Sequence, residues 1–233
     1  MLAIFKRELK AYFVSPVGYV VLAVFLVFSG FYFSYMFSNG YPDVTFVFSQ
    51  MFAITLFIVP ILTMRLMSED RRQKVDQVLL TSPVKLSSII LGKFFAALAV
   101  FALGFANTLI FQIILSFYVS LNWLIFIGNV VGMLLLGGSL IAIGLFISAL
   151  TESQMVAAVG TFAISMFILM MDSLASTINI SAITKAAEWI SFSGRYNTFV
   201  SGVFDYSNLI FFVSVAAIFL FLAVRSLEKK RWA

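Results

Sequence analysis

Six apolar blocks divide the chain, each long enough to cross a lipid bilayer as a helix. The hydrocarbon core of a bilayer is about 30 Å thick, and roughly 20 apolar residues of helix cross it. The blocks are continuously apolar, whereas the strands of a membrane barrel alternate over about ten residues. We therefore predict an all-α membrane protein with six transmembrane helices, at residues 17–37, 46–64, 89–118, 123–150, 155–171 and 208–224.

The composition supports a membrane protein. Hydrophobic residues make up 62% of the chain and charged residues only 11%, and the mean hydropathy is +1.08. Soluble domains carry about 25% charged residues. The chain contains neither Cys nor His. Disulfide, thiol and imidazole chemistry are therefore excluded, and we predict no metal site and no catalytic residue.

Basic residues predict the orientation in the membrane. All of the Lys and Arg residues except Lys185 and Arg195 lie near the N-terminus, around the connector between the second and third blocks, or in the C-terminal tail. Cytoplasmic loops hold the excess of basic residues, so we expect both termini and this connector on the cytoplasmic face of the cell (inner) membrane. This topology accounts for the net charge of +5, and no nucleic-acid partner is predicted. Aromatic rings prefer the headgroup layer, which places Tyr12 at the inner interface and Tyr196 at the outer one.

We predict a single transmembrane domain over residues 1–233, with three segments outside the spans. Residues 1–16 combine an apolar face with basic residues across from it, which favours an interfacial helix that ends before Pro16; the alternative is an ordinary basic flank. Residues 65–88 form a cytoplasmic loop. Residues 172–207 form an outer loop, in which residues 186–192 and 196–204 predict two short re-entrant helices; the alternative is a surface loop anchored by aromatic side chains.

The cytoplasmic loop has the pattern of a helix. Ser68 can cap a helix whose first turn carries Glu69 and Asp70, where negative charge is favourable. This helix should end near Thr81, because Pro83 pushes the preceding residue out of helical geometry. Its mixture of charge and a small apolar stripe suits docking into a groove of a soluble partner. The alternative is a solvated connector that happens to be helical.

Two further sets of residues stand out inside the spans. Polar side chains there should face protein or a cavity, either lining a path or making hydrogen bonds between helices; they are Asn107, Gln112 and Asn129. Small residues at four-residue spacing allow close helix packing, within the chain or between subunits; they are Gly128, Gly132, Gly138 and Ala142.

The sequence contains no phosphate-binding loop. Its one Gly-Lys pair, Gly92 and Lys93, has Ser87 where such a loop needs its first Gly and Phe94 where it needs Ser or Thr. We therefore predict that the chain is not an enzyme and that nucleotide energy comes from another polypeptide.

Three segments together resemble the type-2 ABC exporter permeases. EDRRQKVDQVLLTSPVKLSSIILGKFFA is similar to the family's signature after the second span, ISALTESQMVAAV resembles its short inner loop, and FVSGVFDYSNLIFFVSVAAIFLFLAVRSLEKKRW resembles its outer element, last span and basic tail. Their order and spacing resemble those of the subgroup that includes the gliding-motility permeases.

The resemblance implies a function and a mechanism. Two permease chains, identical or homologous, would form a translocation path in the lipid bilayer, each bound to a separate ATPase subunit that holds ATP and Mg; this chain itself would bind no cofactor. The ATPases would push on the coupling helix and tilt the spans. The implied contact residues are Glu69, Asp70, Arg71, Arg72, Asp76 and Gln77, with Val78 and Leu79 packing into a cleft of the ATPase.

Two other functions remain open at this point. An ion-coupled secondary transporter would need carboxylates deep within the spans, and Glu152 and Asp172 lie at span ends. A membrane scaffold without a translocation path is the third reading. The apolar, uncharged spans favour an amphipathic or lipid-like cargo over a highly charged one.

Overall fold

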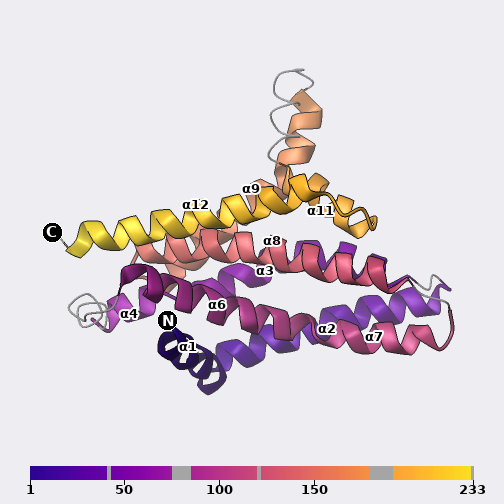
Figure 1. Ribbon diagram of the computed structural model, residues 1–233, viewed down its shortest axis with the longest axis horizontal. Coiled ribbons are helices and arrows are strands. Elements are labelled where there is room, and N and C mark those ends of the chain that lie inside the picture. The colour runs from indigo at the N-terminus through magenta and orange to yellow at the C-terminus, as the bar shows by residue number, and fades with distance from the viewer. Residues whose placement is uncertain (41–42, 75–84, 120–121, 179–190, 232–233) are drawn as a thin grey trace.

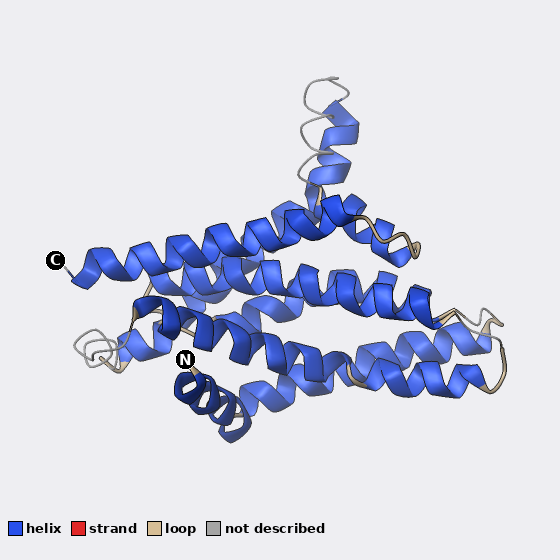
Figure 2. Ribbon diagram, in the orientation of Figure 1, coloured by secondary structure: helices blue, strands red, loops and turns tan. Residues whose placement is uncertain are grey.

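The computed structural model describes residues 1–40, 43–74, 85–119, 122–178 and 191–231. Within these ranges every regular element is an α-helix and no strand is present (Figure 2). The helices are α1 (Leu2–Val14), α2 (Pro16–Ser38), α3 (Val44–Thr63), α4 (Ser68–Arg72), α6 (Leu86–Phe105), α7 (Asn107–Ser116), α8 (Trp123–Leu150), α9 (Gln154–Ile178), α11 (Phe192–Val200) and α12 (Tyr206–Arg231). The chain is an all-α membrane protein, as the sequence predicts.

Six helical segments of the described chain are long and apolar enough to cross a membrane: Pro16–Ser38, Val44–Arg72, Leu86–Ser116, Trp123–Leu150, Gln154–Met171 and Tyr206–Lys229. All six predicted spans are therefore present. The third one differs in detail, because it consists of two helices, α6 and α7, that meet at Ala106. Continuous apolarity locates a span but does not report such a break in its backbone.

Helix α8 forms the centre of the bundle. It packs against α3, α6, α9, α11 and α12. Among the six spans it has the largest share of buried residues, whereas α2, α9 and α12 have the smallest. A helix that is apolar all round suits both environments, protein on the inside and lipid on the outside. The exposed apolar side chains of the outer helices thus form the surface that faces lipid.

The ends of the bundle carry different connections. Both termini and α4 lie at one end, on the left of Figure 1. The end of α2, the end of α7 and the start of α8 lie at the opposite end. Helix α1 runs across the bundle axis and is seen nearly end-on, and the C-terminal part of α9 projects away from the other helices. The termini and α4 therefore lie at the same end of the bundle, and an even number of spans likewise puts both termini on one side.

The structure alters two sequence predictions about the connectors. The predicted loop helix from Ser68 to Thr81 is not continuous, because α4 ends at Arg72 and Lys74 adopts a positive φ of 56°, outside right-handed helical geometry. Of the two predicted outer helices, α11 begins at Phe192 and ends at Val200, earlier than expected. Residues 186–190 lie outside the described residues.

Candidate functional site

The start of α4 is fixed to the end of α8 by one hydroxyl group. The Oγ of Ser148 accepts hydrogen bonds from the backbone N–H groups of Met67 and Ser68, each at 3.1 Å, and donates to the carbonyl of Met64, also at 3.1 Å. The prediction that Ser68 caps this helix is wrong: Ser68 is the first residue of α4, and its hydroxyl donates to the carbonyl of Met64. The free amides at a helix start need acceptors, and here a different span supplies one.

Helix α1 is tied to the same region through Tyr12. This side chain is buried, and its hydroxyl donates to the carbonyl of Leu62 at 2.7 Å. Burial raises the pKa of the Tyr12 hydroxyl, so it stays protonated as the donor. Arg65 donates to the hydroxyl of Ser15 and forms an ion pair with Glu69, with 2.9 Å between nitrogen and oxygen. The connector between α1 and α2 is thus held against the end of α3.

A buried lysine lies between two acids from different helices. The Nζ of Lys93, on α6, is 2.7 Å from the Oδ2 of Asp70, on α4, and 3.0 Å from the Oε1 of Glu8, on α1. Only 1% of the Lys93 side chain is exposed. Arg7 adds ion pairs to Glu8 at 2.6 Å and to Asp70 at 3.5 Å. We call these four residues the α1–α4–α6 ion cluster.

The charges of the cluster depend on one another. Burial disfavours the charged carboxylate of Glu8, but the positive charges and hydrogen bonds of Lys93 and Arg7 outweigh that cost, and the pKa of Glu8 falls below its ordinary value. A buried ion pair is strongly destabilised when one partner is removed, because the remaining charge stays buried without compensation. The cluster therefore holds α1, α4 and α6 in one arrangement.

Gly92 allows α1 and α6 to pack closely together. A Cβ atom at Gly92 would lie 3.0 Å from the Cγ2 of Ile4 and 3.3 Å from the carbonyl oxygen of Met1. The Gly92–Lys93 pair thus serves packing and ion pairing with α1. Sequence reasoning assigned Lys93 to the basic connector and missed Glu8 and Ser148. A lysine one turn or more inside an apolar span was the available signal, since such a charge needs a partner.

The predicted coupling residues occupy different environments. Asp70 is part of the ion cluster, and Arg71 is buried with 5% of its surface exposed. Glu69 is partly exposed and pairs with Arg65, while Arg72 is exposed. The remaining predicted contacts, Asp76, Gln77, Val78 and Leu79, lie outside the described residues. On α4, the side chains at 69 and 72 are therefore the ones that a partner can reach.

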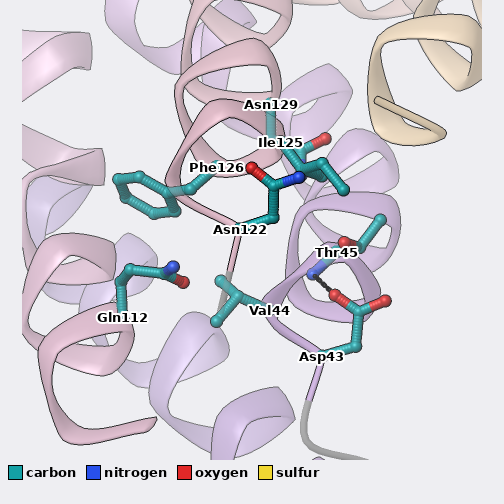
Figure 3. A pocket seen from close by; sticks show the side chains of 8 residues that line it. All are labelled: Asp43, Val44, Thr45, Gln112, Asn122, Ile125, Phe126 and Asn129. Carbon is teal, nitrogen blue, oxygen red and sulfur yellow. Dashed lines mark hydrogen bonds between the residues drawn. The ribbon is translucent and has the colours of Figure 1, made fainter. Parts of the chain in front are cut away.

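The three polar residues singled out within the spans lie in two different parts of the bundle. Asn107 donates from its Nδ2 to the Oγ of Ser29 on α2 at 2.5 Å, which is an interhelical hydrogen bond. Gln112 and Asn129 instead line one pocket at the end of the bundle away from α4, together with Asp43 and Asn122 (Figure 3). The structure thus brings two of the three predicted residues together.

The small residues of α8 pack within the chain. A Cβ atom at Gly132 would lie 2.7 Å from the Cβ of Phe199 on α11, and one at Gly128 would lie 3.4 Å from the ring of Phe204. Gly138 faces Leu98 and Phe94 of α6 at 3.7 and 3.8 Å with room to spare, and Ala142 is fully buried.

Tyr196 anchors the outer helix α11 on the bundle. Its side chain is buried inside the protein instead of facing the headgroup layer, and its hydroxyl donates to the carbonyl of Phe48 at 2.8 Å. The ring stacks on Phe52 of α3, with 5.4 Å between the ring centroids. Together with the contact of Phe199 at Gly132, this fixes α11 against α3 and α8.

A comparison with known protein families shows which family this chain belongs to. The family model described as ABC-2 type transporter matches residues 1–193, from α1 into α11. The chain belongs to this family. No curated protein sequence matches it. As an ABC-2 membrane domain, the chain is a multi-pass permease component of an ABC transporter and is not itself the ATPase, and the family implies association with ATP-binding subunits.

Proposed function

We propose that this ABC-2 permease exports its cargo across the cell (inner) membrane, driven by separate ATPase subunits that bind ATP and Mg at its cytoplasmic face. In this orientation both termini, α4 and residues 65–88 lie in the cytosol. The observation that carries the proposal is the fixed attachment of α4 to three other helices. Ser148 attaches it to α8, Lys93 to α6, and Arg7 to α1.

The attachments explain how a push at the loop reaches the spans. Force applied near α4 would be shared by α6 and α8, because a buried ion pair and three hydrogen bonds at the hydroxyl of Ser148 connect them. Such packed and hydrogen-bonded connections are the physical means by which distant sites are coupled. Helix α4 then acts as a rigid lever between the ATPase and the bundle.

We assign two roles within the predicted coupling segment. Asp70 and Arg71 support α4 from inside, since both side chains face this chain. Glu69 and Arg72, with residues 76–79, form the contact with the ATPase. None of them is catalytic. A second permease chain, identical or homologous, completes the translocation path, and the order of the three resembling segments supports the gliding-motility-permease subgroup.

The alternatives fit less well. An ion-coupled carrier needs carboxylates within the spans, and all ten acidic residues lie at span ends or outside the expected spans. A scaffold without transport has no need of a lever that joins three helices. An ion-coupled carrier would transport without regard to ATP, and a scaffold would transport nothing.

Purification tests the assembly. The tagged chain, solubilised in a mild detergent from its native cells, is expected to recover a nucleotide-binding subunit with it. Arg72→Glu reverses an exposed charge on α4 and should reduce the recovered ATPase several-fold. Lys6→Glu makes the same change on the exposed face of α1 and should leave recovery unchanged. Recovery of the chain without any ATPase would reject the proposal.

A further inference from the structure

An apolar groove runs along the side of the bundle between the third span and α8. Two cavities form it, one of about 310 Å³ toward α7 and one of about 370 Å³ toward the α4 end, and Leu134 lines both. On the third span the lining extends from Leu91 on α6 to Leu109 on α7, which lie end to end beside α8 in Figure 1. Helix α12 forms a wall of the second cavity. We call the two cavities together the α6–α8 groove.

The groove has a buried floor and exposed rims. Gly138 lies in its lining, and a Cβ atom there would have its nearest neighbour at 3.7 Å, so space remains above the helix. The ring of Phe212 is fully buried beneath it. The side chains of Leu109 and Val213 are about half exposed and form the rims. The groove is therefore open sideways and continuous with the apolar surface that faces lipid.

The described lining offers no free polar group. It contains no charged residue, and its two polar side chains are Thr108 and Ser139. The hydroxyl of Thr108 donates to the carbonyl of Phe105 and that of Ser139 to the carbonyl of Leu136, both at 2.7 Å. A cavity with apolar walls and no unpaired polar atoms does not retain water. The occupant of the groove must therefore be apolar.

The width of the groove selects the kind of apolar occupant. The third span rises about 27 Å from Leu91 to Leu109, and α8 rises about 20 Å from Phe126 to Ser139. The two volumes spread over this length give a cross-section of about 25–35 Å², or a width of about 6 Å. A helix with its side chains is about 10–12 Å wide. A hydrocarbon chain is only about 4–5 Å wide, since non-bonded carbons touch at about 3.5–4.0 Å. The groove thus fits a single chain and is too narrow for a helix.

From the apolar lining, the width and the continuity with the lipid-facing surface, we propose that the α6–α8 groove binds acyl chains of membrane phospholipids. Its length is most of the hydrocarbon thickness of about 30 Å, so each cavity takes a chain from one leaflet. A chain in the groove touches protein on several sides, whereas a chain on the outer surface of α9 touches it on one. Because contact energies add up over many atoms, the groove holds its chains more tightly. This site goes beyond the proposed function and does not depend on the orientation in the membrane.

Photo-cross-linking tests the site. The full-length chain is reconstituted into vesicles of phosphatidylcholine that carries a photoactivatable diazirine in the middle of one acyl chain. The sample is transferred to excess mild detergent, which strips loosely held lipid, and is then irradiated and mapped by mass spectrometry. Cross-links at Leu109 and Val213 should exceed those at Val159 about tenfold. Val159 lies on α9 and is at least as exposed as the other two, so exposure alone predicts the opposite order.

Three variants connect retention to the shape of the groove. Ala217→Phe narrows the second cavity from an exposed position, and Gly138→Leu fills it from the floor. Either change should lower cross-linking at Val213 to the level of α9 while preserving it at Leu109 in the first cavity. Gly30→Leu is the matched control, because a Cβ atom at this position of α2 would meet nothing within 4 Å. It should leave both cross-links unchanged.

The contrary outcomes identify other occupants. Cross-links at Leu109 and Val213 no stronger than at Val159 would show that lipid only coats this face, and would overturn the site. So would retention that survives both groove-filling variants or is lost equally in Gly30→Leu. Rapid disulfide-linked dimer formation by Val213→Cys in oxidised membranes would show that a second copy covers the groove instead. Whether an ATPase co-purifies has no bearing on these results, so the proposed function is tested separately.

Discussion

The ammonium group of Lys93 lies 2.7 Å from the carboxylate of Asp70, and these two residues belong to elements that the chain separates by more than twenty positions. Lys93 is 1% exposed, and its other partner, Glu8, comes from α1. This ion pair joins the charged connector to the third span at the end of the bundle where both termini lie.

Removing the lysine charge should destabilise the protein. Lys93→Met removes the buried cation between Glu8 and Asp70 and leaves them only the half-exposed Arg7, so we expect a loss of about 3 kcal/mol, the lower end of the cost of breaking a buried pair. Thermal unfolding in detergent measures it. The triple variant Glu8→Gln, Asp70→Asn, Lys93→Met removes the uncompensated charges and should recover most of the loss. Lys10→Met, at an exposed position of α1, is the control and should change little. Equal effects at positions 93 and 10 would contradict the role of the ion cluster.

The same cluster predicts a dependence on acid. The pKa of Glu8 lies below its ordinary value of 4.5 in the folded protein. Glu8 therefore contributes stability above pH 4.5, and the contribution is lost as the pH falls through the lowered value. Melting temperatures between pH 3 and 7 should decrease more steeply for the unmodified protein than for Glu8→Gln. Parallel curves for the two proteins would show that Glu8 is not stabilised by its partners.

We expect the hydroxyl of Ser148 to stabilise the start of α4. Ser148→Ala removes the acceptor for the N–H groups of Met67 and Ser68, at an expected cost of about 1–3 kcal/mol. Hydrogen exchange of residues 66–72 should accelerate. Ser139→Ala is matched, because Ser139 is equally buried and donates only to the carbonyl of Leu136 within α8. It should leave the exchange of α4 unchanged, and faster exchange there in both variants would argue against a specific cap.

Two glycines of α8 provide a test of packing. Gly132→Ala would place a Cβ atom 2.7 Å from that of Phe199 and should cost about 1–3 kcal/mol. Gly138→Ala has its nearest neighbour at 3.7 Å and should be neutral or slightly stabilising, because Ala favours helix. Unfolding of the two variants in the same detergent compares them directly. The reverse order would contradict the close contact between α8 and α11.

The sequence predicts the spans well, because hydropathy and the length of an apolar run depend only on neighbouring residues. The fourth predicted span, 123–150, coincides with α8, and the break before Pro16 separates α1 from α2. Charge runs likewise indicate which connectors share a face. These properties are local, and they do not depend on which helices pack together.

Contacts between distant residues could not be predicted in this way. Lys93 and Glu8 are 85 positions apart, and a charge near a span end is usually a solvated flank. The sequence likewise places Tyr12 and Tyr196 at the headgroup layer, whereas both are buried with their hydroxyls on backbone carbonyls of α3. Only the packing of α1 and α11 on the bundle decides between these environments.

The central claim is that force from a separate ATPase enters the bundle through α4. Spin labels on Ser116→Cys and Ser201→Cys, at exposed positions at the far end of the bundle, report the distance between α7 and the end of α11 in the assembled complex. Adding ATP should shift this distance, Arg72→Glu should abolish the shift, and Lys6→Glu should preserve it. A distance that is the same with and without ATP, or a shift that persists in Arg72→Glu, would contradict the account.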